Sequence, residues 1–269
     1  MASSKRGGAG KAQTSVWLEG GKPAPKRKAG AGVDAAGGGA LDLERIVTET
    51  IRLLDAEGFA KFSMRRLAAA LGVTAMSVYW YVDTKDDLLE IALDEVHREM
   101  VVPDAAAATD EAADWRAQMR VLALEYRRLL SGHPWVAQLL GQYLNIGPRS
   151  MEFSNVALAV VRRSGLPFEE VTGALGAVFQ FVYGFCSIEG QFKERCRATG
   201  ETEDEYFERL MGQISDSGAL TETFHAAAEL VETQQKSRIP LSERRERDFL
   251  FALDTVIAGI EVMRDRASV

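Results

Sequence analysis

Residues 63–82 read SMRRLAAALGVTAMSVYWYV, and this stretch decides the fold of the chain. Ser63 is a good N-cap for the run of helix formers that follows it and ends at Leu71. Gly72 permits the left-handed backbone of a sharp turn, and Thr74 is suited to cap a second, short helix. A helix of eight residues, a short turn and a two-turn helix together have the spacing of a helix-turn-helix.

The second helix of this pair runs from Ala75 to about Tyr81. Leu67, Leu71 and Val78 are spaced to lock the two helices together. The side chains left outward are Ala75, Met76, Ser77, Tyr79, Trp80 and Tyr81. Small, hydroxyl-bearing and aromatic groups of this kind suit base edges, thymine methyls and phosphates. A helical hairpin with aromatic residues is also common as a core fragment, so the spacing alone leaves both interpretations open.

Helical periodicity continues on both sides of this pair. Asp42 begins an amphipathic segment that ends at Gly58, and Asp83-Thr84 begins a helix whose apolar stripe reaches Met100. Further helices are predicted at 115–130, after the turn at 133–135, and at 151–163, 168–192, 205–236 and 243–266. The chain has no credible strand pattern and no internal repeat, so we expect an all-α protein.

Charge is distributed unevenly along the chain. Residues 1–40 carry seven basic and two acidic residues, residues 41–85 carry six of each, and the whole chain has a net charge of −7. The basic start is rich in Gly and Ala, and we expect it to be disordered when free. Ser15-Val16-Trp17-Leu18 is its exception, either a short sticky patch or an element that orders on a partner.

Composition and missing motifs exclude several classes of protein. The two cysteines, Cys186 and Cys196, cannot form a disulfide framework and lie in no metal-ligand spacing. No apolar run approaches the roughly 20 residues of a membrane span, and the basic residues at the start have no apolar segment behind them, so we expect no signal peptide. We therefore expect a cytoplasmic protein with no membrane segment, no metal and no cofactor.

Two rival functions remain to be weighed. An enzyme is disfavoured because no nucleophile elbow, P-loop or metalloprotease motif occurs. The three histidines also lack partner patterns, and His97 is predicted on a charged helix face. A redox sensor is the other alternative: Cys186 is expected to be buried, whereas Cys196 lies among basic residues that could lower the pKa of its thiol.

Residues 43–100 resemble the DNA-binding domain of the tetracycline-repressor family. The similarity is carried by MRRLAAALGV at 64–73, SVYWYV at 77–82 and KDDLL at 85–89. It continues more weakly at 173–189, which looks like the family's long eighth helix, and at 249–263, which looks like its final helix. The basic start also resembles the Trp-containing extension of some actinobacterial efflux repressors.

The resemblance implies a homodimeric transcription regulator, usually a repressor, that binds a palindromic double-stranded DNA operator and releases it when a small-molecule effector binds. It divides the chain into a basic arm at 1–40, a helix-turn-helix domain at 41–88 and a helical ligand-binding and dimerisation domain at 89–269. The residues matched to base-facing places are Met64, Arg65, Ala75, Met76 and Tyr79. Those matched to phosphate-holding or positioning places are Ser63, Thr74, Ser77, Trp80, Tyr81 and Lys85.

Direct base recognition by this set is sparse, because Arg65 alone among these residues can make a bidentate guanine contact. A domain with no net charge also supplies little electrostatic affinity for DNA. Lys26, Arg27 and Lys28 are candidates to supply it, because a flexible Gly/Ala tether of this length reaches about 20 Å, enough for an adjacent minor groove. A solubilising tail is the alternative.

The C-terminal domain offers an apolar and aromatic set for an effector. By analogy with the family, its candidate lining is Met119, Leu122, Tyr126, Tyr143, Asn145, Phe153, Phe179, Gln180 and Tyr183. Each of these side chains is also a reasonable core residue, but together they favour a large apolar or aromatic ligand. Glycines at 173, 176 and 184 let helices approach closely, and Val256 and Ile260 are expected at the homodimer interface.

Overall fold

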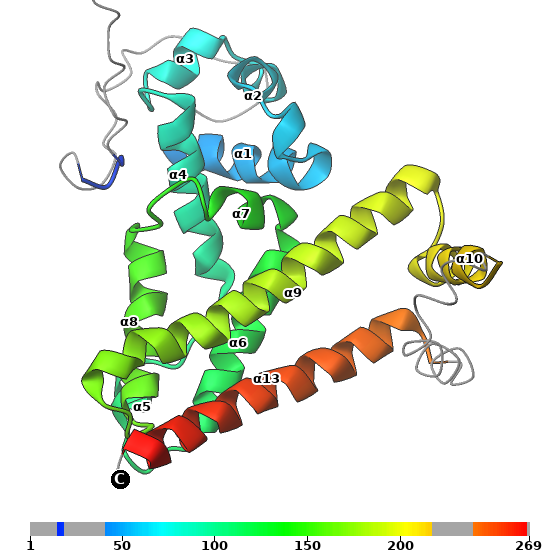
Figure 1. Ribbon diagram of the computed structural model, residues 1–269. Helices are drawn as coiled ribbons and strands as arrows, with labels where there is room; N and C mark the ends of the chain where they lie inside the picture. Colours follow the sequence, from blue (N-terminus) through cyan, green and yellow to red (C-terminus); the bar gives the residue numbers. More distant parts are fainter. Residues whose placement is uncertain (1–14, 19–40, 217–238, 268–269) are drawn as a thin grey trace, which may run out of the picture. The chain divides into compact units, whose positions relative to one another are not determined.

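The computed structural model describes residues 15–18, 41–216 and 239–267 (Figure 1). Its regular elements are helices, with no strand in these three ranges, which confirms the all-α prediction. The chain forms two compact units. The first comprises residues 1–99 and 138–153, and the second comprises 100–137 and 154–269.

The first unit is built on four helices and two short 3-10 turns. They are α1 (Leu43–Glu57), η1 (Phe59–Lys61), α2 (Met64–Leu71), α3 (Ala75–Tyr79), α4 (Lys85–Glu95) and η2 (Val96–Glu99). Local chemistry sets where they begin: the side chains of Asp42, Ser63, Thr74 and Thr84 accept hydrogen bonds from the first turns of α1, α2, α3 and α4. Gly72 ends α2 in the left-handed conformation, with φ 71°.

The core of this unit lies where α1, α2, α3 and α4 meet. Ile46 of α1, Leu67 of α2, Val78 of α3 and Leu88 of α4 are each 0% exposed. Because α3 has only five residues, its single buried residue, Val78, fixes the side on which the helix rests. The outward side chains of α3 follow from that contact.

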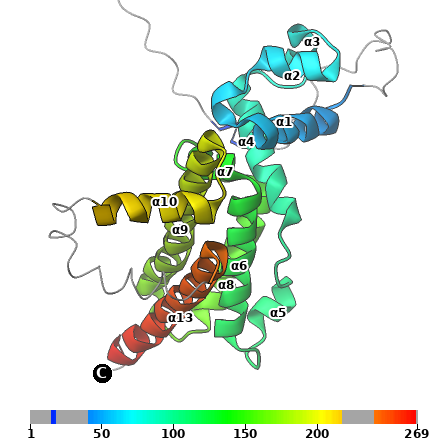
Figure 2. The same cartoon turned by 90° about the vertical axis from the view of Figure 1, so that its right-hand side faces the viewer.

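The second unit is a bundle of longer helices. They are α5 (Ala105–Thr109), α6 (Trp115–Gly132), the start of α7 (Pro134–Leu139), most of α8 (Pro148–Arg162), η3 (Phe168–Glu170), α9 (Val171–Thr199), α10 (Glu203–Asp216) and α13 (Leu241–Ala267). Helix α9 packs against α6, α13 and α10 (Figure 2). Phe249, Leu253 and Val182 are fully buried in this packing.

The end of α9 differs from the sequence-based expectation. Helix α9 continues past Phe192 to Thr199, because the ring of Phe192 packs edge-on against Tyr206 of α10 and so gives this polar stretch a tertiary contact. The compact units divide near residue 99. The capped helix α4 runs without interruption through residue 88.

The prediction that no segment is apolar enough to cross a membrane needs correction. Within Phe168–Thr199, an 18-residue window has a mean hydropathy of 1.5, although only 28% of that window is buried within the chain. It is the one helix of this kind in the described ranges. The apolar surface of α9 therefore exceeds what α6, α10 and α13 cover.

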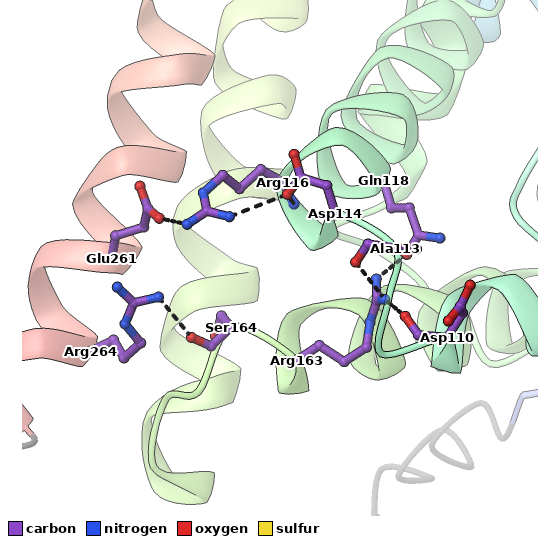
Figure 3. Close-up of polar contacts among 9 residues, drawn as sticks. All are labelled: Asp110, Ala113, Asp114, Arg116, Gln118, Arg163, Ser164, Glu261 and Arg264. Atoms are coloured by element: carbon purple, nitrogen blue, oxygen red, sulfur yellow. Dashed lines mark hydrogen bonds and ion pairs between the residues drawn. The ribbon is translucent and has the colours of Figure 1, made fainter.

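An arginine cluster ties together the end of the second unit that contains α5 and the C-terminal turns of α8 and α13 (Figure 3). Arg163 donates hydrogen bonds to the carbonyl oxygens of Asp110 and Ala113 and to the side chain of Gln118. Arg116 pairs with Glu261 of α13. Because Arg163 holds main-chain carbonyls, this cluster fixes the turn that leads into α6.

Leu67→Ala is expected to lower the free energy of unfolding by about 2–5 kcal/mol, because it leaves a cavity where a fully buried leucine joins α2 to its neighbours. Chemical denaturation of both proteins measures this loss. Ala69→Gly, at an exposed position of the same helix, is the control and should cost only about 1 kcal/mol. Equal losses in the two variants would contradict this description of the core.

Candidate nucleic-acid interface

Two residues of α3 and Trp80, which caps its C-terminus, have large exposed side chains. Met76 is 68% exposed, Trp80 is 52% exposed and Tyr79 is 39% exposed. Arg65 of α2 is exposed as well, and Ala75 and Ser77 are half-buried. Such a cluster of apolar and aromatic groups on one short helix is unusual for a surface that meets only water.

The hydroxyl residues of the predicted site hold the ends of its helices. Ser63 Oγ accepts a hydrogen bond from the Arg66 N–H at 3.3 Å. Thr74 Oγ1 accepts one from the Ser77 N–H at 3.2 Å and lies 2.9 Å from Ser77 Oγ. These residues therefore orient α2 and α3, whatever else their hydroxyl groups bind.

Met64 does not lie where the resemblance placed it. Its side chain is 8% exposed and belongs to the core of the first unit. Met64 lies on the same side of α2 as Leu67, Ala68 and Leu71, which are also buried. Its expected base-facing place is therefore corrected to a packing position.

Tyr81 and Lys85 are used inside the first unit. The Tyr81 hydroxyl donates a hydrogen bond to the Leu41 carbonyl, next to the start of α1. Lys85 Nζ donates to the Phe62 carbonyl at 3.4 Å and lies 5.1 Å from the centre of the Phe59 ring. Both side chains therefore make contacts that position parts of the first unit. Lys26, Arg27 and Lys28 lie outside the described residues.

Helix α4 presents an edge of carboxylates that sequence reasoning missed. The Tyr143 hydroxyl donates to Asp86 Oδ1 at 3.0 Å, and the pKa of Tyr143 is raised by burial and by this carboxylate. Asp94 Oδ1 accepts from the N–H groups of Arg149 at 3.1 Å and Ser150 at 3.0 Å. A Cβ on Gly147 would collide with the Asp94 side chain. Residues 143–150 are therefore shaped to fit α4.

The predicted effector residues divide between the two units. Met119 and Leu122 are 0% exposed on α6, and the rings of Tyr126 and Phe179 meet edge-on with centroids 5.5 Å apart. The Tyr183 hydroxyl donates to the Ala137 carbonyl at 3.0 Å. Gln180 is exposed on α9. Three others belong to the first unit: Tyr143, Asn145 and Phe153.

A charged residue that packs on two other rings of the second unit was also missed. The Arg127 guanidinium lies 4.1 Å from the centre of the Phe249 ring and 5.5 Å from that of Phe185. It forms ion pairs with Glu246 at 2.5 Å and Glu189 at 3.8 Å, and the Arg127 side chain is only 12% exposed. The only sign of this cluster in the sequence is Arg127 itself, a basic residue next to Tyr126 on a helix whose buried side is otherwise apolar.

The cysteines do not have the properties of a redox sensor. Cys186 is 7% exposed, and burial raises the pKa of its thiol to about 11. Cys196 is 3% exposed, and burial raises its pKa as well, contrary to the expectation that neighbouring cations lower it. Neither thiol has the lowered pKa of a redox-sensing cysteine, and the redox alternative has no support.

His97 was also predicted wrongly. It is 6% exposed, its Nδ1 lies 2.8 Å from the Leu93 carbonyl oxygen, and burial lowers its pKa. His97 lies in the 3-10 turn that follows α4, where Val96 is buried with it. Among residues 15–18, 41–216 and 239–267, no group of His, Cys, Asp and Glu could hold a metal ion.

Two family models match the chain. Residues 46–92 match the model described as bacterial regulatory proteins of the tetR family. Residues 107–264 match the model described as the C-terminal domain of tetracycline-repressor-like proteins. Together these two matches span the helix-turn-helix unit and most of the helical bundle.

Individual relatives agree with this result. An HTH-type transcriptional regulator of Saccharopolyspora erythraea is 33% identical over 186 residues, which is 69% of this chain and 76% of the relative. The HTH-type transcriptional repressor DrrR1 of Streptomyces coeruleorubidus is 34% identical over 62% of this chain and 60% of its own length. The crystal structure of apo ActR from Streptomyces coelicolor matches in fold, with a TM-score of 0.66 and 24% identity over 84% of this chain and 98% of ActR.

The helix-turn-helix geometry, the exposed aromatic surface of α3 and the helical bundle that follows thus agree with matches to both parts of the family. The chain belongs to the TetR family of bacterial transcriptional regulators.

Proposed function

We propose that the protein is a homodimeric cytoplasmic repressor. It binds a palindromic operator through α2 and α3 and releases it when a small apolar or aromatic effector binds in the helical bundle. The observation that carries this proposal is the exposure of Met76, Tyr79 and Trp80 on a short helix held by Val78. The repressor DrrR1 is a relative whose name supports the direction of regulation.

Contacts to bases are assigned to the side chains that remain free to reach a groove. Arg65 supplies a bidentate donor for guanine, and Met76 offers an apolar contact for a thymine methyl. Tyr79 and Trp80 offer hydroxyl and indole N–H groups to phosphates. The helix-capping residues Ser63 and Thr74 lie where α2 and α3 begin, at the ends whose free N–H groups attract phosphate.

Arg65→Ala and Tyr79→Ala are each expected to weaken operator binding by about 1–3 kcal/mol, with little change in unfolding free energy, because both side chains are exposed in the free protein. A gel-shift titration on DNA from the upstream region of the protein's own gene measures the effect. Arg52→Ala removes the same charge from an exposed position on α1 and is the control. An effect of Arg52→Ala as large as that of Arg65→Ala would sink the assignment.

Dimerisation is assigned to the exposed apolar surface of α9 and α13. Ile188 of α9 is 73% exposed and Phe251 of α13 is 75% exposed, whereas Ile260 is 5% exposed. Ile260 therefore packs within the chain, which corrects its expected place at the interface. A soluble monomer rarely leaves residues such as Ile188 and Phe251 in water over a helix of this hydropathy, and a second copy would cover them.

Phe251→Glu and Ile188→Glu together are expected to convert the dimer to monomers, because each places a charge in a dry interface. Sedimentation velocity measures the mass, and operator affinity should fall because one half-site is lost. Val121→Glu, at a 44% exposed position on α6, is the control and should stay dimeric. A wild-type protein that sediments as a monomer at every working concentration would contradict the model.

The effector site is assigned to the contact between α6 and α9, where Tyr126 meets Phe179. Met119 and Leu122 provide an apolar floor on the same helix as Tyr126. ActR, which shares this fold, has been solved in complex with actinorhodin, and this supports a small-molecule effector for the present chain.

Actinorhodin is the first probe for this site. It is expected to raise the melting temperature of the wild type and to weaken operator binding, because an effector must favour a dimer geometry that DNA does not. Tyr126→Ala with Phe179→Ala should abolish both responses. Phe168→Ala, at a 74% exposed ring in the same unit, should leave them intact. If a wider set of aromatic compounds stabilises the double variant and weakens its operator binding as strongly as in the wild type, the effector site lies elsewhere.

A further inference from the structure

The segment Ser15–Leu18 forms a compact turn in the first unit. The Leu18 N–H donates to the Ser15 carbonyl at 3.0 Å, and the Trp17 N–H donates to Ser15 Oγ at 3.4 Å. Ser15 itself is only 6% exposed. A short turn buries its first residue in this way only when another element covers it.

That other element is helix α4. The Ser15 hydroxyl donates a hydrogen bond to Glu90 Oε2, across 75 positions of sequence. The backbone N–H of Val16 donates to the same carboxylate. Glu90 is 6% exposed, and burial raises its pKa, so its carboxylate has lost water and depends on these two donors.

Glu90 occupies the middle of the carboxylate edge of α4. Asp86 and Asp94 lie one turn away on either side and are held by Tyr143 and by the N–H groups at the start of α8. Their partners come from residues 138–153, whereas the partners of Glu90 come from the N-terminal segment. Glu90, between Asp86 and Asp94, is therefore a receptor for a short turn that presents one hydroxyl and one N–H group.

We propose that residues 15–18 are an intramolecular ligand for α4, with Glu90 as the receptor, and that docking tightens operator binding. The second part rests on the proposed repressor function. Docking buries a carboxylate in a unit that must approach DNA. It also attaches the start of the basic segment 19–40 to the unit whose α1 begins where that segment ends. Release of the turn would expose the carboxylate and detach the start of the basic segment from the unit. Each of these changes would weaken the binding of a polyanion such as DNA.

The test uses full-length protein and two single variants, S15A and E90Q, with their double variant. The reporter is the hydrogen-exchange rate of the Leu18 amide, because neither substitution removes its acceptor, the Ser15 carbonyl. If the turn is docked through Glu90, each single variant should speed this exchange by about tenfold or more, the range of a hydrogen bond to a charged group. The double variant should exchange no faster than the faster single variant, since one contact cannot be lost twice.

Thr48→Ala and Glu44→Gln are the matched controls, because they remove an exposed hydroxyl and an exposed carboxylate from α1 of the same unit. Neither should change Leu18 exchange. Wild-type exchange rates in S15A and E90Q, or additive effects in the double variant, would overturn the docking site.

Operator affinity of the same proteins tests the second part. S15A should weaken binding by up to about tenfold, since coupling between docking and DNA is reciprocal and cannot exceed the docking loss. E90Q should weaken it less, because the glutamine leaves no carboxylate to face DNA when the turn is released. In S15A, faster Leu18 exchange with unchanged operator affinity would leave the docking site and overturn its coupling to DNA. A wild type that binds no operator would overturn the repressor function, while the exchange result would still decide the docking.

Discussion

The burial of Val78 against α2 is the contact on which the nucleic-acid interface depends. Helix α3 has five residues, so one buried side chain fixes its rotation about its own axis. Met76, Tyr79 and Trp80 then point away from the core because they lie at other angles around the helix. Gly72 and the Thr74 cap set the turn that precedes α3. A few local hydrogen bonds and the packing of Val78 therefore orient the exposed surface formed by Met76, Tyr79 and Trp80.

Electrostatics divides the first unit into two surfaces of different use. Residues 41–85 carry no net charge, so the helix-turn-helix within them relies on shape, on Arg65 and on the N–H groups of helix ends. Helix α4 carries carboxylates that would repel DNA, and each of Asp86, Glu90 and Asp94 is satisfied by donors from another segment. Burying these charges with partners keeps α4 folded and limits the negative field beside the DNA-binding helices.

Helix α9 supplies both packing contacts and an exposed apolar surface to the second unit. One side of α9 packs on α6 and α13, where Val178 and Val182 are fully buried. The rest of its long apolar surface is left exposed in a single chain. Such a distribution of uncharged residues suits a helix that packs within the chain on one side and, in the proposed dimer, on a second copy on another.

Sequence alone determined the features that arise from neighbouring residues. The caps at Asp42, Ser63 and Thr74 and the turn at Gly72 depend on bonds three to five residues long, so composition and spacing were sufficient to predict them. The tertiary structure alone decided which side chains remain free. Met64, Tyr81 and Lys85 are occupied by packing or by carbonyls from other elements, Ile260 is buried while Phe251 is exposed, and Ser15 finds Glu90 across most of the first unit. Periodicity defines the apolar side of a helix, but burial depends on which distant element covers that side, and no local pattern contains that information.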